Sequence, residues 1–125
     1  MKMALVILAL LLIAAAALAA PVTVYVSPTG NDAASGLKPE TPVATLAKAQ
    51  EIARAARQGS AEGYKLVLRG GSYYLPATLA FGPEDSGTEQ APTQVVPFKG
   101  ETVRLVAGRD LRKEAWQPWQ GEIKQ

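Results

Sequence analysis

The sequence predicts a mostly β fold with a single helix. Short runs rich in β-branched and aromatic residues recur after Pro21, and turn-forming Gly and Pro residues separate them. One stretch, which begins after Thr45, carries its apolar residues at helical spacing. Short strands of this kind suit a sandwich, a barrel or a solenoid, and no strict internal repeat decides among the three.

The first 19 residues differ from the rest of the chain. All of them except Lys2 are apolar, and residues 5–13 form an unbroken apolar run that small residues follow. Residues 17–19 fit the small-x-small pattern that signal peptidase reads. Residues 1–19 are therefore predicted to be a signal peptide, and the protein is expected to be secreted or periplasmic and to meet a membrane only during export. The residues predicted to be recognised by the peptidase are Ala17, Ala19 and Ala20.

A transmembrane anchor is the alternative for this segment, because about 20 apolar residues can span a bilayer. The Ala-rich end, the cleavage pattern and the presence of Pro21 where basic stop-transfer residues would stand favour the signal peptide. The absence of Cys excludes a lipoprotein anchor.

Residues 20–125 are predicted to form one domain. The helix is expected to start after Thr45 as N-cap and to stop at Gly59, with an Ala-rich buried stripe close against a sheet and Arg54 on another face. The polar stretch 82–92 is expected to be a loop. Strands are expected at residues 22–26, 64–69, 72–75, 78–81, 93–98 and 102–106.

Composition excludes several functions. Lys and Arg number 13 against 11 Asp and Glu, and this balance provides no basic face for a nucleic-acid partner. Without Cys or His there can be no disulfide, zinc finger, thiol nucleophile or Ser-His-Asp triad. Only 42 of residues 20–125 are hydrophobic, so the core is expected to be too thin for an independent folding unit.

Two polar pairs could bind a ligand, and Glu84 and Asp85 are the only adjacent carboxylates. Glu84 and Asp85 could bind Ca²⁺ or contact a sugar, but an Asp85 side chain that accepts backbone N–H bonds in a turn is the preferred interpretation. Ca²⁺ needs about six or more oxygen ligands, and one pair supplies few of them. Asn31 and Asp32 are likewise expected to cap a turn.

Aromatic and basic residues offer further candidates. A tight corner is expected at Gly70 and Gly71, since no Gly-Lys-Ser/Thr follows to make a phosphate loop. Strand alternation requires Tyr73 or Tyr74 to face inward. Sugar stacking is an alternative for Tyr73, Tyr74, Trp116 and Trp119. A basic cluster comprises Arg104, Arg109, Arg112 and Lys113. We expect this basic cluster to be solvated, with binding of acidic polysaccharide as the alternative.

An ordered set of motifs spans nearly all of residues 20–125. It begins with Tyr-Val-Ser-Pro-Thr-Gly-Asn-Asp at 25–32 and Pro-Val-Ala-Thr-Leu at 42–46. Leu-Arg-Gly-Gly-Ser-Tyr-Tyr-Leu at 68–75 and Pro-Glu-Asp-Ser-Gly-Thr at 83–88 follow. In these motifs the chain resembles secreted right-handed parallel β-helix proteins of the pectate-lyase-like superfamily. It departs from their pattern at Pro97, which is expected to keep its strand short or at an edge, and at Lys99.

The resemblance implies that residues 20–125 are the N-terminal cap and first one or two coils of a truncated solenoid. Its relatives are glycoside hydrolases or polysaccharide lyases whose catalytic residues, and any Ca²⁺ ligands, lie on later coils. No catalytic, cofactor-binding or metal-binding residue is therefore expected in this chain, and polysaccharide is the partner only through a full-length protein. The alternatives are a non-catalytic surface or binding stalk and the relic of a truncated gene.

Overall fold

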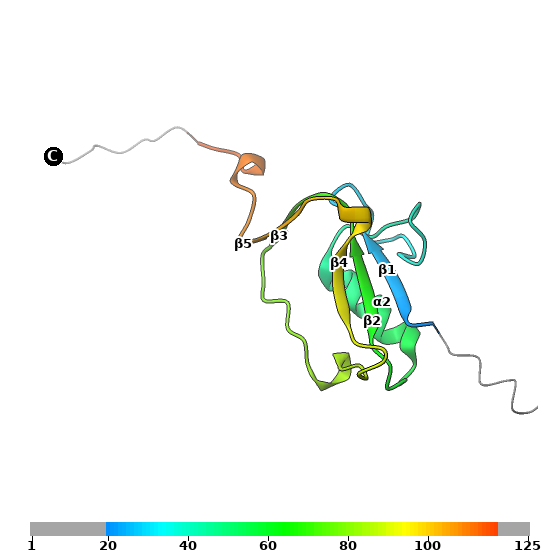
Figure 1. Ribbon diagram of the computed structural model, residues 1–125. Helices are drawn as coiled ribbons and strands as arrows, with labels where there is room; N and C mark the ends of the chain where they lie inside the picture. The colour runs from blue at the N-terminus through cyan, green and yellow to red at the C-terminus, as the bar shows by residue number, and fades with distance from the viewer. Residues whose placement is uncertain (1–19, 118–125) are drawn as a thin grey trace, which may run out of the picture.

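Parallel strands and one helix make up the computed structural model, which describes residues 20–117 (Figure 1). From β2 onward, successive strands belong alternately to two small sheets. Three short 3-10 turns, at Pro83–Asp85, Phe98–Gly100 and Leu111–Lys113, lie in the connections. The main elements are β1 (Val22–Val26), α2 (Leu46–Arg57), β2 (Tyr64–Leu68), β3 (Gly71–Leu75), β4 (Gln94–Pro97) and β5 (Val103–Ala107).

In each sheet the strands are parallel and lie side by side in the order in which they occur along the chain. The first has the strand order β1-β2-β4 and the second pairs β3 with β5. The chain therefore adds one strand to each sheet through β2 and β3, and again through β4 and β5. The sheets stay open, and residues 20–117 form no closed barrel.

The core lies between α2 and the first sheet. Ala49 and Ala53 on the helix are fully buried, and their small side chains let α2 approach β1 and β2 closely. Tyr64, Leu66 and Leu68 of β2 point to this side, as the alternating pattern of the sequence predicts. The buried cluster also includes Val24, Val26, Val43, Leu46 and Tyr73.

One edge of the first sheet is covered. The Tyr25 N–H donates to Gly36 O at 2.7 Å, and Tyr25 O accepts from the Val43 N–H at 3.0 Å. Val26 and Val43 also form a parallel bridge. The loop that follows β1 therefore satisfies the outer backbone groups of that strand, which would otherwise be free to pair with another chain.

The opposite edge is open. Val95 of β4 is in register with Leu66, and Leu105 of β5 is in register with Tyr73. Leu66 and Tyr73 are buried, yet Val95 is 42% exposed and Leu105 is 52% exposed. Because side chains in register on parallel strands point to the same face, Val95 and Leu105 face inward but lack a covering layer among residues 20–117.

Most of the predicted elements are confirmed. The helix starts after Thr45, whose hydroxyl accepts from the Lys48 N–H, and it ends at Arg57. β4 is four residues long and at an edge, as Pro97 predicts. The expected strand at residues 78–81 is wrong: the segment is an irregular connection, and its Ala80 carbonyl accepts from helix side chains instead of from a neighbouring strand.

Some expectations are not decided by the structure. The mostly β fold with one helix is confirmed, while the solenoid and the domain boundaries remain predictions. The predicted signal peptide, residues 1–19, lies outside the described residues, and so does Trp119. Of the three residues predicted to be recognised by signal peptidase, only Ala20 is described. No helix within residues 20–117 is long and apolar enough to cross a bilayer.

Candidate functional site

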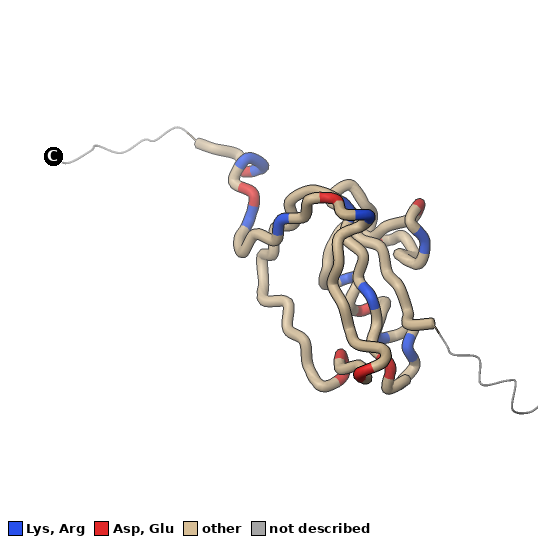
Figure 2. Tube along the Cα trace, in the orientation of Figure 1, with Lys and Arg blue, Asp and Glu red and all other residues tan. Residues whose placement is uncertain are grey.

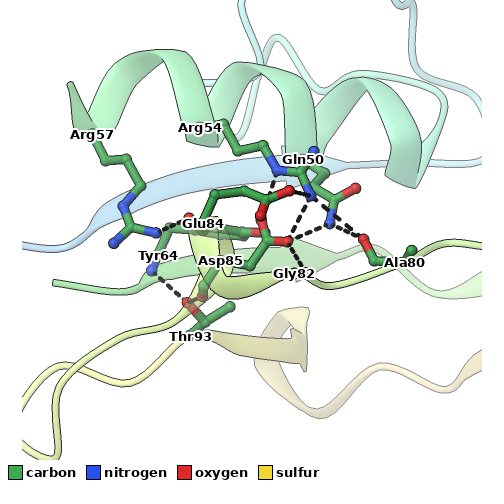
Figure 3. A network of polar contacts seen from close by, with 9 residues as sticks. All are labelled: Gln50, Arg54, Arg57, Tyr64, Ala80, Gly82, Glu84, Asp85 and Thr93. Atoms are coloured by element: carbon green, nitrogen blue, oxygen red, sulfur yellow. Dashed lines mark hydrogen bonds and ion pairs between the residues drawn. The ribbon is translucent and has the colours of Figure 1, made fainter. Parts of the chain in front are cut away.

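The most highly connected polar residue is Asp85, which is 3% exposed at the end of the Pro83–Asp85 turn (Figure 3). Arg54 binds both carboxylate oxygens, with Nε at 2.7 Å and Nη2 at 2.6 Å. The Tyr64 hydroxyl donates at 2.7 Å, the Gly82 N–H at 2.8 Å and the Gln50 amide at 3.3 Å. Five donors thus bring α2, β2 and the loop of residues 80–86 together.

This arrangement fixes the ionisation of its members. Hydrogen bonds from the Arg54 guanidinium, and then from Tyr64 and Gly82, hold the pKa of Asp85 well below its usual range, although burial opposes them. Burial, together with the hydrogen bond to Asp85, raises the pKa of Tyr64 to about 12. Asp85 is therefore a buried anion whose oxygens are already occupied.

The same loop is held to the helix at a second point. Arg57 donates to the carbonyl oxygens of Glu84, Ser86 and Ser60. The Thr93 hydroxyl donates to the Asp85 carbonyl at 2.5 Å. These contacts fasten the loop that leads into β4 against the end of α2, which is a structural role.

Asp85 and Glu84 do not form a catalytic pair. A general acid needs a raised pKa and access to substrate, and Asp85 has neither. Glu84 is 58% exposed and pairs with the same Arg54 at 3.1 Å. No cluster of three or more potential metal-ligating side chains occurs within residues 20–117.

The expected turn at Asp85 is confirmed only in part. Its carboxylate accepts from the Gly82 backbone N–H, but Arg54, which we expected on another helix face, is its main partner. Gln50 and Arg54 are four residues apart and so share a helix face, which is the one sequence signal that could have revealed the network. Nothing in the sequence indicates that Asp85 lies opposite them.

Asn31 caps a turn, as expected, whereas Asp32 reaches the start of α2, which the sequence did not predict. Asn31 Oδ1 accepts from the Ala33 N–H at 2.9 Å. Asp32 accepts from the backbone N–H groups of Ala44 and Thr45 and from the Thr45 hydroxyl, at 2.8–2.9 Å. The Asp32 carboxylate therefore anchors the long loop to the start of α2.

The expected corner at Gly70 and Gly71 links successive strand pairs. Gly71 has a φ of 138°, and the Gly71 N–H donates to Thr102 O at 3.0 Å. Glu101 accepts from the Gly70 N–H and from Arg69 Nε. The backbone hydrogen bond, and then Arg69, lower the pKa of Glu101. The corner between β4 and β5 is thereby tied to the corner between β2 and β3.

The two tyrosines of β3 separate as alternation requires. Tyr73 faces inward, and its hydroxyl donates to the carbonyls of Val26 and Arg69. Burial, and then the charge of Glu101, raise its pKa to about 12. Tyr74 is half-buried, and its hydroxyl accepts from Arg112 Nη2 at 3.0 Å. Trp116 is exposed, with its indole N–H on Leu111 O.

The basic cluster is solvated, and acidic residues alternate with it along the chain (Figure 2). Arg109 pairs with Glu114 at 3.5 Å and Arg112 with Asp110 at 2.8 Å. Arg104 is exposed on β5. Arg112 and Lys113 border a groove beside Tyr74 that the sequence did not reveal.

Comparisons with known proteins give two structural neighbours. No family profile matches the chain, and no curated protein matches it. A solved structure described as "Glycoside hydrolase" is 37% identical, with a TM-score of 0.60 over 66% of this chain. One described as "Rhamnogalacturonan lyase" is 23% identical, with a TM-score of 0.46 over 66% of this chain.

The chain matches 14% of the first protein's length and 21% of the second's. The glycoside hydrolase is consistent with the carbohydrate-active relatives that the sequence resembles. The glycoside hydrolase has the identity and the structural similarity to support an argument about this chain.

Proposed function

We propose that residues 20–117 form the N-terminal cap and first coils of a right-handed parallel β-helix in an exported carbohydrate-active protein of the glycoside hydrolase type. The observation that carries the proposal is the asymmetry of the stack. Its β1 edge is covered by a loop and its core by α2, while β4 and β5 leave inward-facing apolar side chains uncovered. A solenoid cap needs one closed end and one end on which the next coil packs.

The comparison supports the carbohydrate-active part of the proposal. The similarity to a glycoside hydrolase extends over two thirds of this chain but over a seventh of that protein. A cap of this size fits a small share of a long solenoid. The predicted signal peptide supports the export of the protein. Polysaccharide is the proposed partner of the full-length protein. By the full-length protein we mean the longest form that its gene encodes.

The proposal assigns catalysis to later coils. Glycoside hydrolysis needs two carboxyl groups about 5–10 Å apart on either side of the sugar bond. Asp85 is buried among five donors, and Glu84 shares its Arg54. Residues 20–117 thus serve as the N-terminal cap of the solenoid. Ca²⁺, if the full-length protein uses it, binds on those later coils.

Two experiments test this proposal together. Sequencing the genomic DNA beyond the codon for Gln125 is expected to reveal further short strands of the same spacing, with acidic residues clustered on one face. The full-length protein is then expected to release sugars from one member of a panel of plant polysaccharides, while residues 20–125 alone release none. Measurable turnover by residues 20–125 would overturn the assignment of catalysis to later coils, and later coils carrying only Thr/Asn ladders would favour a stalk.

A further inference from the structure

A groove lies between the start of α2, strand β3 and the Leu111–Lys113 turn. Its volume is about 640 Å³, within the range of small-molecule sites. It is distinct from the Asp85 network, whose oxygens and donors already satisfy one another. No function discussed above uses it.

The lining of the groove combines apolar, aromatic and hydroxyl side chains. Leu46, Leu75 and Leu79 are its apolar members, and Tyr74 contributes an aromatic ring. Ser72 and Thr78 add hydroxyl groups. A sugar ring presents apolar C–H faces and a polar edge, so a surface that combines an aromatic ring with hydroxyl groups is suited to it.

The charged wall is preorganised. Asp110 binds Arg112 Nε at 2.8 Å and Nη2 at 2.9 Å, and the same Nη2 reaches the Tyr74 hydroxyl. The Asp110 side chain is largely buried, whereas Arg112 is exposed. Arg112 Nη1 has no acceptor among residues 20–117, so it can donate to a ligand without breaking the existing contacts.

The charges of the lining favour an anion. Asp110 offsets one of the two cations, and Lys113 forms no ion pair within the described part of the chain. With Arg112, Lys113 and Asp110 all in the lining, one net positive charge remains at the groove. Charge-assisted hydrogen bonds from guanidinium and ammonium groups to a carboxylate are stronger than neutral ones.

We propose that this groove binds an acidic saccharide, with a uronate carboxylate on Arg112 and Lys113 and the sugar ring against Tyr74. The choice of a saccharide rests on the proposed carbohydrate-active function, while the position of the site and its preference for an anion rest on the geometry. The groove joins the start of α2 and strand β3 to the turn that follows β5.

Calorimetric titration of the full-length protein with a galacturonic acid trisaccharide tests the site. The galactose trisaccharide of the same linkage is the neutral probe. We expect the acidic probe to bind, and Arg112→Gln to weaken that binding by about tenfold. Lys113→Gln and Tyr74→Ala are expected to weaken it severalfold. Lys65→Gln removes one positive charge from β2, none of whose residues line the groove, and it is expected to leave the affinity within about twofold.

Three outcomes would overturn the groove. They are equal affinity for the acidic and the neutral probe, equal weakening by Lys65→Gln and Arg112→Gln, and an affinity for the acidic probe that Arg112→Gln leaves unchanged. Circular dichroism of each variant checks that the fold is intact. A full-length protein that degrades polysaccharide but shows one of these outcomes retains the proposed function and loses the groove. One without activity on polysaccharide that still binds the acidic probe here loses the function alone.

Discussion

At the scale of single residues, Asp85 decides how the loop of residues 80–86 is held. Its carboxylate is buried, and four of its five donors come from side chains on α2 and β2. Removing one partner of such a network leaves the others with unsatisfied hydrogen-bonding groups, which costs more than the hydrogen bond itself contributes.

We predict that Asp85→Asn lowers the free energy of unfolding of the full-length protein by about 2 kcal/mol. The amide keeps the size of the side chain but cannot accept from Arg54 at both ends, and it removes the negative charge next to that guanidinium. Chemical denaturation of the two proteins measures the difference.

Glu84→Gln is the matched control for this substitution. It removes the neighbouring carboxylate, which is exposed and pairs with the same Arg54, and is expected to change stability by less than about 0.5 kcal/mol. Because the pKa of Asp85 is lowered by folding, its contribution is present above the unfolded value of 3.8 and is lost as the pH falls below it. Asp85→Asn should therefore reduce the loss of stability in acid, and an unchanged acid profile would contradict this account.

At the scale of elements, the sequence of α2 itself favours the helix, and a residue outside the helix anchors its start. Its Ala-rich buried face and Thr45 cap are local features of the sequence. Asp32 adds a second restraint from 12 and 13 residues upstream, because it accepts the N–H groups of Ala44 and Thr45. The loop that covers β1 and the start of the helix are therefore coupled.

Asp32→Ala is expected to destabilise the full-length protein by about 1–2 kcal/mol and to loosen the loop that covers β1. Hydrogen exchange should report faster opening at the N–H groups of Ala44 and Thr45, and at the Tyr25 N–H, which donates to Gly36 in the same loop. Asn31→Ala is the control, since Asn31 accepts only from the nearby Ala33 N–H. Equal effects of the two substitutions would refute a special role for Asp32.

Sequence patterns predicted what depends on near neighbours in the chain. The strand alternation of β2, the placement of Tyr73 and Tyr74 on opposite faces and the edge position of Pro97 all follow from local periodicity or from the missing N–H of proline. The Arg54–Asp85 and Arg112–Tyr74 contacts join residues 31 and 38 positions apart. Such pairs depend on how the elements pack, which no local pattern encodes.

The wrong strand at residues 78–81 has the same cause. Its apolar and β-branched residues suit a strand, but a strand also needs a neighbour with which to pair. In this fold the segment crosses from β3 to the loop that α2 holds, and Gln50 and Arg54 take up the Ala80 carbonyl. The strand propensity of residues 78–81 is therefore overridden by tertiary contacts.

At the scale of the whole molecule, the stack has one finished end and one unfinished edge. The core residues of β2 are covered by α2, whereas Val95 and Leu105 face inward without cover among residues 20–117. Repeat folds gain stability mainly from neighbouring repeats, and about three are needed. In the solenoid that we propose, the next coil would supply the cover that the thin core of residues 20–117 lacks.

Residues 20–125 alone are accordingly expected to aggregate at micromolar concentration instead of unfolding cooperatively as a monomer. Val95→Lys places a charge at the open β4 edge and should slow this aggregation, because an inward charge at an edge opposes strand pairing. In the full-length protein the same substitution should destabilise by about 2 kcal/mol or more, since the next coil would bury the charge. Ala55→Lys adds the same charge on the exposed side of α2 and should do neither. Light scattering measures the aggregation and thermal unfolding measures the stability. A cooperative monomeric transition of residues 20–125 would contradict the open edge as the place where the next coil packs. So would a Val95→Lys substitution that is favourable in both proteins or unfavourable in both.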